Sequence, residues 1–383
     1  MKPKVIVVDL VSDDLAVGRS LSLAALRQHG RVVRETLILG GEASWLGMGV
    51  SPVSATHRIT SRIAPRWIAA RRVQGAIDAA VARHEAQSCV LHIWSPRALA
   101  WAAPAVRPTT PMLIDVDLDD RLDRVARWRR ALPSNVCVGL RVPTAAAQRA
   151  LGAQGVRVDD IPLIRGLVDY SAVNEARHSD ARARLGITHD MTTILILPPI
   201  TPAAGSFGAL WAALLLEKIR RDVRVLVPQG GPESRRLAAL ARATRHDAVV
   251  SLVDPACGLP LLLAACNLAL FTPPGDAPVW ALPWAMAAGV RIVASAVPAV
   301  TEMLAHGHNA WLCRPANPRD ACRRCLRALE RTDESRKLGE AARSGAFRVF
   351  SRQRMIEQYE QAYANLLAGR PAGAGVVDAA LVG

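Results

Sequence analysis

The sequence has little of several features that membrane, secreted and nucleic-acid-binding proteins need. Among its 383 residues, no apolar run reaches the ~18 residues that a membrane-spanning helix requires. The opening stretch, residues 1–9, lacks the long apolar centre and the small-residue cleavage site of a signal peptide. Aromatic residues make up only 4% of the chain, and no basic stripe is interleaved with stacking rings, so we expect no nucleic-acid binding. These absences predict a cytoplasmic protein that makes at most peripheral contact with the inner membrane face.

Cysteine chemistry is also scarce. The seven cysteines are mostly scattered through apolar stretches, a pattern typical of small core residues. Cys322 and Cys325 form the sole C-x-x-C pair, inside an arginine-rich helical stretch, and no second pair stands at zinc-site spacing. We therefore expect no metal and no bound cofactor.

Positive charge is plentiful, and nearly all of it is arginine. The formal net charge is +15, and the only lysines are Lys2, Lys4, Lys218 and Lys337. An arginine- and alanine-rich composition can reflect a GC-rich genome. It can also favour an anionic ligand or surface, and the composition leaves both interpretations open.

Short apolar strands alternate with helical stretches throughout the chain, and the length suits two domains. This pattern predicts an α/β protein of two Rossmann-like, doubly wound parallel-sheet domains facing across a cleft. We expect an N-terminal domain at 1–168, a C-terminal domain at 169–349, a closing helix at 350–368 that returns to the first domain, and a disordered Gly- and Ala-rich tail at 369–383.

Seven short motifs, in order and at matching spacing, give the chain a resemblance to the B-fold (GT-B) glycosyltransferases, in particular the retaining family-four group. They correspond to the hinge, the short helix after it, three segments of the second domain, a glycine turn and the closing helix. They are residues 164–169 (IRGLVD), 182–187 (RARLGI), 257–273, 284–295 (WAMAAGVRIVAS), 300–302 (VTE), 307–310 (GHNA) and 350–367. The resemblance implies transfer of a sugar from a nucleotide-sugar donor, held mainly by the second domain, to an unknown lipid-linked or glycan acceptor.

The positions that bind the donor in relatives have changed here. Relatives hold the diphosphate with an Arg and a Lys, but this sequence has Pro199 and Ala204 at those positions. Their Glu-x7-Glu pair becomes Asp276 and Trp284, and an indole cannot accept the ribose hydrogen bonds. Losing two basic contacts and one acid removes roughly 5–9 kcal/mol, on the order of 10³- to 10⁶-fold in affinity.

Other family positions are kept or replaced in part. The histidine after the central strand of the first domain becomes Asp117, and a Gly-Gly loop is reduced to Gly18. The glutamate of the "x-P-E" motif is kept as Glu302, whereas the glycine pair before it becomes Pro298-Ala299. The resemblance thus points to Asp276 and Asp117 as candidate catalytic residues and to Glu302, Trp284 and Gly18 as candidate donor-binding residues.

Two replacements for the lost charge are conceivable. Helix N-termini near Gly205-Ser206 and near Pro278 would present N–H groups that favour phosphate. The second replacement is a relocated arginine, for which the candidates are Arg165, Arg19 and Arg97. The alternative interpretation of each is an ordinary solvated or helix-end arginine.

Several candidates have a plain structural interpretation as well. Asp276 can be the N-cap of a helix with Pro278 in its first turn, and Glu302 can simply brace the next helix. Trp280 and Trp284, four residues apart, are either core or a stacking floor for a ring of the donor. Asp115, Asp117 and Asp119 alternate onto one side of a strand end, where they form either a metal site or a solvated terminus.

Two segments could lie on an anionic membrane: residues 58–73 and 121–132, both basic and apolar with a tryptophan. Ordinary surface helices with arginines reaching to solvent give the same pattern. For the whole chain two hypotheses remain. One is a glycosyltransferase, hexosyl-type and retaining if active, with a rearranged donor site. The other is a catalytically dead homologue that acts as a binding or scaffold protein.

Overall fold

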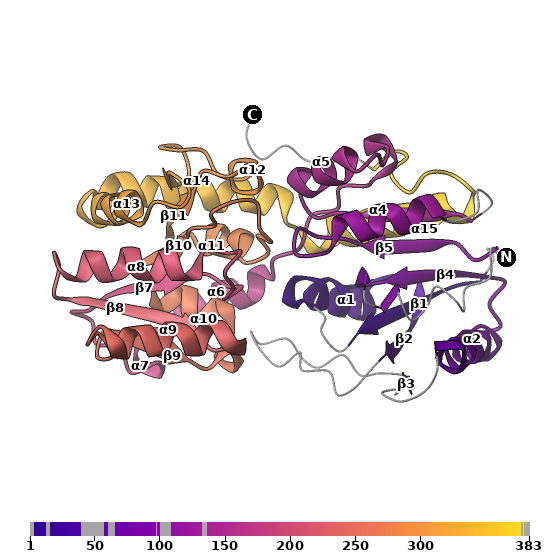
Figure 1. Ribbon diagram of the computed structural model, residues 1–383, viewed down its shortest axis with the longest axis horizontal. Coiled ribbons are helices and arrows are strands. Elements are labelled where there is room, and N and C mark those ends of the chain that lie inside the picture. The colour runs from indigo at the N-terminus through magenta and orange to yellow at the C-terminus, as the bar shows by residue number, and fades with distance from the viewer. Residues whose placement is uncertain are drawn as a thin grey trace. The chain divides into compact units, whose positions relative to one another are not determined.

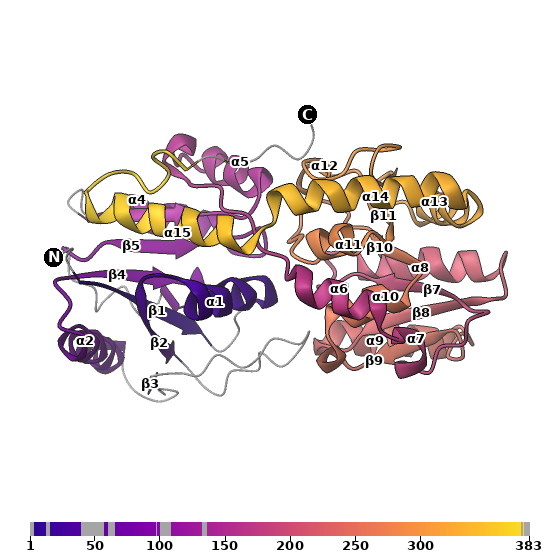
Figure 2. The ribbon, with the colours of Figure 1, turned by 180° about the vertical axis from the view of Figure 1, so that it is seen from behind.

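A computed structural model gives the fold of two compact units. It describes residues 4–12, 16–39, 57–59, 66–96, 98–99, 109–131, 136–376 and 378. Unit 1 contains the described residues up to Gly166 together with Arg352–Asp378, and unit 2 contains Leu167–Ser351. Each unit is built on its own parallel sheet (Figures 1 and 2).

Unit 1 has a six-stranded sheet in the order β3-β2-β1-β4-β5-β6. Its strands are β1 (Val5–Ser12), β2 (Val33–Leu39), β3 (His57–Ile59), β4 (Ser88–Ile93), β5 (Met112–Asp115) and β6 (Val138–Arg141). Its α-helices are α1 (Val17–His29), α2 (Arg66–Arg83), α4 (Leu122–Ala131), α5 (Ala145–Ala153) and α15 (Arg352–Leu367).

Unit 2 repeats this plan in the order β12-β11-β10-β7-β8-β9. Its strands are β7 (Thr192–Ile196), β8 (Val223–Pro228), β9 (Val250–Val253), β10 (Leu268–Phe271), β11 (Arg291–Ser295) and β12 (Trp311–Cys313). Its α-helices are α6 (Tyr170–His178), α7 (Ala181–Arg184), α8 (Ser206–Glu217), α9 (Gly231–Ala243), α10 (Leu259–Ala265), α11 (Leu282–Ala288), α12 (Pro298–Thr301), α13 (Pro318–Glu330) and α14 (Thr332–Val349).

Helices cover both faces of each sheet because the strands alternate their side chains between the faces. In β1, Val8 and Leu10 join the apolar core under α2 and α5, while Asp9 between them lies on the side of α15. In unit 2, α8 and α13 share a core on one face, and α6, α10 and α11 pack together on the other. The two doubly wound parallel-sheet domains predicted from the sequence are confirmed.

The end of the chain differs from the expectation of a disordered tail that starts at residue 369. Residues 368–376 turn back onto α15, where Asn365 Nδ2 donates to the carbonyls of Ala372 (3.2 Å) and Ala374 (2.7 Å). Ala372 is buried against Gly139, where a larger residue would not fit. Residues 377 and 379–383 lie outside the described part. Residues 368–376 are ordered because the buried Asn365 amide bonds to their carbonyls and the Ala372 methyl group packs against Gly139. The Gly- and Ala-rich composition of the segment does not reveal these contacts.

Candidate functional site

The donor-side candidate lies where the strand order of unit 2 reverses, between β7 and β10. Ligands of open α/β sheets bind at such a topological switch point, beside the carboxyl ends of the strands. Here the loop after β7 ends at Gly205, whose φ of 72° favours glycine. A Cβ on Gly205 would lie 1.8 Å from the backbone oxygen of Thr272, and Thr272 Oγ1 donates to the Gly205 carbonyl at 3.0 Å. The start of α8 is therefore held directly against the loop after β10.

The loop after β7 uses its own side chains to hold its shape. Ser206 is buried, and its Oγ accepts from the Thr201 N–H and donates to the Thr201 carbonyl, both at 3.1 Å. Thr201 Oγ1 in turn accepts from the Ala204 N–H at 3.2 Å. The Ser206 hydroxyl is thus used within the loop, and the N–H groups of Gly205 and Ser206 donate to the carbonyls of Pro202 (3.0 Å) and Thr201 (3.4 Å). The N–H groups of Phe207 and Gly208, in the first turn of α8, are left to contact a ligand.

Asp276 is an exposed residue of the loop after β10, and its carboxylate caps a helix. Its Oδ1 accepts from the Ala299 N–H at 2.8 Å, in the first turn of α12. The sequence pointed to a cap of a helix containing Pro278, but that helix, α11, begins only at Leu282. Asp276 therefore links the loop after β10 to the helix after β11, and its fixed, exposed carboxylate remains available to a ligand.

The other two donor-side candidates lie deeper. Trp284 is in α11 and is only 5% exposed, which places its indole in the core of unit 2. Glu302 is half-buried at the C-terminal end of α12, and its backbone N–H donates to the Pro298 carbonyl. Phe207, which the sequence analysis did not single out, is 53% exposed beside Gly205, and its ring stacks on that of Trp211 at 6.3 Å.

Positive charge is missing from the loops at this switch point. Residues 197–206 and 272–281 contain no Arg, Lys or His, and Asp276 is their only charged residue. Two of the three arginines considered as replacements lie in the described part of the chain. Both belong to unit 1, and both are paired with a carboxylate. Arg165 donates from Nε (2.9 Å) and Nη2 (2.8 Å) to Asp378, and Arg19 is buried in an ion pair with Asp120. Arg97 lies outside the described residues.

The corresponding edge of the unit 1 sheet, at the carboxyl ends of its strands, carries several charged side chains. At its own switch point, between β1 and β4, Ser12 Oγ and Ser95 Oγ lie 2.7 Å apart. Gly18 is in the first turn of α1, where its carbonyl accepts from Ser22 Oγ at 3.1 Å. The Arg19–Asp120 pair joins α1 to the loop after β5.

Asp117, in the loop after β5, has a carboxyl group with a raised pKa. Its Oδ1 accepts from the Leu118 N–H at 2.7 Å, and its own N–H donates to Asp120 Oδ2 at 2.8 Å. Burial and the nearby negative charge of Asp119 raise the pKa of Asp117 to about 7, although the Arg19 guanidinium opposes that shift. A carboxyl group with a pKa near neutrality can both hold and release a proton under physiological conditions.

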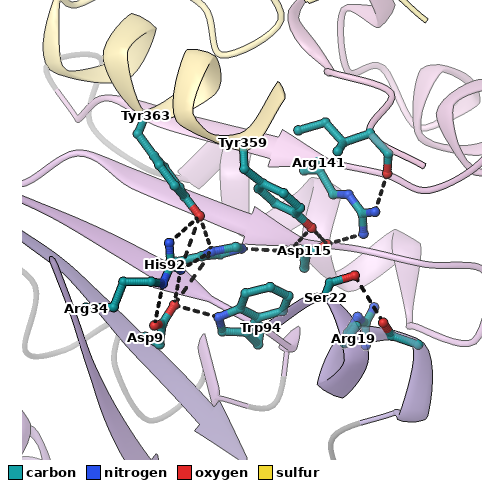
Figure 3. Close-up of polar contacts among 12 residues, drawn as sticks. Asp9, Arg19, Ser22, Arg34, His92, Trp94, Asp115, Arg141, Tyr359 and Tyr363 are labelled. Carbon is teal, nitrogen blue, oxygen red and sulfur yellow. Dashed lines mark hydrogen bonds and ion pairs between the residues drawn. The ribbon is translucent and has the colours of Figure 1, made fainter. Parts of the chain in front are cut away.

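A buried polar cluster lies directly beneath this edge, and we call it the α15 network (Figure 3). It comprises Asp9, Arg34, His92, Trp94, Asp115, Arg141, Tyr359 and Tyr363. Its centre is His92, whose Nε2 lies 2.7 Å from Asp115 Oδ2 and whose Nδ1 lies 2.8 Å from the Tyr363 hydroxyl. Burial lowers the pKa of His92, so the ring is neutral. A neutral ring satisfies both contacts when Nε2–H donates to Asp115 and Nδ1 accepts from Tyr363.

Both carboxylates of the α15 network are neutralised by arginine. Asp9 accepts from Arg34 and from Trp94 Nε1, the latter at 2.8 Å. Burial alone would raise the pKa of Asp115, but the Arg141 guanidinium and the His92 contact hold it at about 2. The α15 network is thus a closed, neutral set of charges that fastens α15 to the sheet, and the carboxylate of Asp115 is bonded within it. No group of three His, Cys, Asp or Glu side chains suited to a metal ion occurs among the described residues.

Most residues of the α15 network could not be recognised from the sequence. His92, Trp94 and the two tyrosines come from segments far apart in the chain, and only Asp115 was singled out. The available signal was the presence of Asp9, His92 and Asp115 within buried apolar strands, because an ionisable group there needs partners. The three residues lie on neighbouring strands, Asp9 opposite His92 in the register of β1 and β4.

Comparison with known proteins supports the fold of the chain and shows which family its second half is similar to. Residues 178–345 match the family model described as "Glycosyl transferases group 1". N-acetyl-alpha-D-glucosaminyl L-malate synthase of Bacillus anthracis is 25% identical over 146 residues, which is 38% of this chain and 38% of the length of that protein.

Two solved structures illustrate the likeness over the whole chain. Anabaena HepE in complex with UDP and glucose superposes with a TM-score of 0.76 at 16% identity, over 94% of this chain and 99% of that one. WaaG, a glycosyltransferase involved in lipopolysaccharide biosynthesis, gives a TM-score of 0.65 at 15% identity, over 95% and 100% of the two chains. The resemblance to B-fold glycosyltransferases of the group 1 type is therefore confirmed. Across the described part of the chain, no helix combines the length and the apolar character needed to cross a bilayer.

Proposed function

We propose, from the group 1 match of residues 178–345, that the protein transfers a sugar from a nucleotide-sugar donor to a still unidentified acceptor. The observation that carries the proposal is the contact between Gly205 and Thr272, which holds the start of α8 at the switch point of the matched unit. In the proposed reaction the bond between the sugar and the diphosphate breaks, a bond between the sugar and the acceptor oxygen forms, and the hydroxyl proton passes to the departing nucleoside diphosphate. The HepE complexes with UDP and with UDP-glucose make a UDP-sugar the first donor to test.

The donor diphosphate would be held by backbone rather than by side-chain charge. N–H groups at a helix start attract phosphate whatever the side chains are. The exposed ring of Phe207 supplies a surface on which a base or sugar ring can stack, a role that the buried Trp284 does not fill. We expect neither a metal nor a cofactor in this site.

Two carboxyl groups would have chemical roles. Asp276 is exposed and fixed by the Ala299 N–H, so it is placed to contact the donor sugar. Asp117 takes the position at which relatives have a histidine. Its pKa of about 7 allows it to exchange a proton at neutral pH as a histidine would. Glu302 is expected to brace the loop that carries Ala299.

Calorimetric titration with UDP-, GDP- and ADP-glucose tests donor binding, with pyrophosphate as the control for a protein of net charge +15. We expect one nucleotide-sugar to bind at micromolar concentration, at least about tenfold more tightly than pyrophosphate. Phe207→Ala should weaken that binding, whereas Ile219→Ala, which removes another exposed apolar side chain just beyond α8, should not. Binding no tighter than pyrophosphate for all three donors would reject the proposal.

A catalytically dead homologue that serves as a binding or scaffold protein is the second candidate. Two observations favour it. The switch-point loops of unit 2 carry no cation, and Arg165 and Arg19 are both engaged by carboxylates. This candidate predicts failure of every donor titration together with specific capture of a partner by the intact protein.

Peripheral contact with an anionic membrane is a separate proposal for unit 1. In α4, Trp128 packs against the core while Arg127 pairs with Asp123, which is the arrangement of an ordinary surface helix. In α2, Arg71 and Arg72 are exposed. Salt-dependent sedimentation with anionic liposomes, weakened by the triple change of Trp67, Arg71 and Arg72 to Ala, would support the contact, and no binding at low salt would exclude it.

A further inference from the structure

A cavity in unit 2 is lined by residues of α6 and α14 and by none of the switch-point loops. Its volume is about 490 Å³, within the range of small-molecule sites. It is lined by Tyr170, Asn174, Arg343, Ser344, Phe347 and Arg348. The four residues from α14 form two adjacent pairs, 343–344 and 347–348, one turn apart, and the two from α6 are four residues apart, so each helix contributes one face.

The lining is cationic and contains no acid. Arg343 Nη2 donates to Asn174 Oδ1 at 2.7 Å, and its Nη1 donates to the Ala287 carbonyl at 3.2 Å. These neutral acceptors fix the guanidinium without cancelling its charge. Arg348 is exposed and forms no ion pair within the described part of the chain. Two uncompensated guanidinium groups beside one cavity match a phosphate group, which accepts paired N–H donors.

The rest of the lining is aromatic. Phe347 is 67% exposed, an uncommon exposure for a phenylalanine, and its ring meets the ring of Tyr170 edge-on at 5.2 Å. The Tyr170 hydroxyl is buried and has no hydrogen-bond partner among the described residues. A buried hydroxyl without a partner is unfavourable, so a ligand that offers it an acceptor gains that interaction.

We propose that this cavity binds a small amphiphile that carries a phosphate group. Arg343 and Arg348 hold the phosphate, the apolar part lies on Phe347, and the Tyr170 hydroxyl donates to an oxygen of the ligand. The site is independent of the proposed sugar transfer, because none of its residues belongs to the switch-point loops.

Calorimetry with octyl phosphate tests the proposal, with inorganic phosphate and octyl glucoside as probes for each half of the ligand. Octyl phosphate should bind more tightly than either. Arg348→Ala and Phe347→Ser should each weaken its binding, by on the order of tenfold for the arginine. Both side chains are exposed, so neither change is expected to unfold the protein. Arg235→Ala, which removes an exposed arginine of α9, is the matched control and should have no effect.

The source of the phosphate group can be distinguished with vesicles of phosphatidylglycerol and of phosphatidylcholine. Binding to phosphatidylglycerol vesicles that is lost in Arg348→Ala but kept in the triple Trp67, Arg71 and Arg72 variant would assign the cavity to a lipid headgroup. Binding of octyl phosphate without vesicle binding would assign it to a free ligand. The proposal is overturned if octyl phosphate fails to bind, or if it binds equally well to Arg348→Ala and Phe347→Ser.

Discussion

The two units share one strand order but differ in the chemistry at their switch points. The edge of unit 1 carries Arg19, Asp117 and Asp120 above the α15 network. The corresponding edge of unit 2 is built from prolines, alanines and Gly205, with Asp276 as the only charge in its two loops. The same backbone plan therefore supports a charged edge in one unit and a nearly uncharged one in the other.

The comparison shows that charge is used for different purposes in the two units. In unit 1 the α15 network uses charge inside the domain, where buried carboxylates are matched by buried arginines and fasten α15 to the sheet. In unit 2 the edge is shaped by close backbone contact, and the remaining carboxylate is positioned by a helix start. A ligand can reach the second arrangement without first breaking an ion pair.

The largest expected effect comes from breaking the internal charge balance of unit 1. Arg141→Met leaves Asp115 buried without its cation, and we expect a loss of about 3–5 kcal/mol in the free energy of unfolding at pH 7. The pKa of Asp115, about 2 in the native protein, would rise, so the loss should shrink as the pH falls toward 3. Arg127→Met, which breaks an exposed pair, should cost no more than about 0.5 kcal/mol. Denaturant titrations of both variants measure the difference, and equal losses would contradict this role for Arg141.

The second effect tests the backbone contact of unit 2. Gly205→Ala places a methyl group on the Thr272 oxygen in a left-handed conformation, and we expect a loss of about 3 kcal/mol or more. Gly186→Ala is the control, because Gly186 has a similar φ of 64° but nothing within 4 Å of its Cβ. It should cost about 1–2 kcal/mol. If thermal unfolding shows the two variants to be equally stable, the contact does not shape the site.

A smaller effect concerns the protonation of Asp117. Because its pKa is raised from 3.8 to about 7, the folded protein keeps a proton that the unfolded chain releases between pH 4 and 7. The free energy of unfolding therefore falls as the pH rises through that range, by about 1–2 kcal/mol after allowance for solvent screening. Asp117→Asn removes this dependence. The stability of the variant relative to that of the native protein should therefore be higher at pH 8 than at pH 5. Denaturation midpoints at the two pH values check this, and a difference that does not change with pH would refute it.

The smallest expected effect on stability separates the two roles of Asp276. Asp276→Ala removes the cap on α12 and should cost about 1 kcal/mol, whereas Asp276→Asn keeps an acceptor for the Ala299 N–H and should cost less. If the carboxylate also acts on the donor, Asp276→Asn should lose sugar transfer while keeping its stability. Release of UDP from UDP-glucose and thermal unfolding, measured on both variants, give the answer. Full activity in Asp276→Asn would leave the residue only its capping role.

Much of the fold could be predicted because strand and helix patterns are local. The alternating strands predicted both sheets except for their outermost strands, β3 and β12, and five of the seven ordered motifs lie within the group 1 segment, residues 178–345. Helix α14 was not predicted, because Gly339 and Gly345 interrupt its helical pattern. Gly339 is required there, since a Cβ would lie 2.4 Å from the backbone oxygen of Gly289, the residue that follows α11. Such a requirement depends on a contact between distant segments, which one sequence does not reveal.

The candidate site could be predicted only in part. The replaced positions at Pro199, Ala204 and Trp284 were visible in the sequence, but the partners of Asp276 and Arg165 were not. The first caps a helix that begins more than 20 residues later, and the second pairs with Asp378, 213 residues away. Phe207 was missed because its exposure follows from the packing of α8, not from its neighbours in sequence.

The most direct test of the central claim is hydrogen exchange of the intact protein with and without UDP-glucose, followed peptide by peptide. If the donor binds at the switch point of unit 2, protection should appear in residues 198–210 and 272–300, at the start of α8 and around Asp276 and Ala299. Protection confined to residues 16–20 and 112–121 of unit 1, or none in either region, would contradict the account.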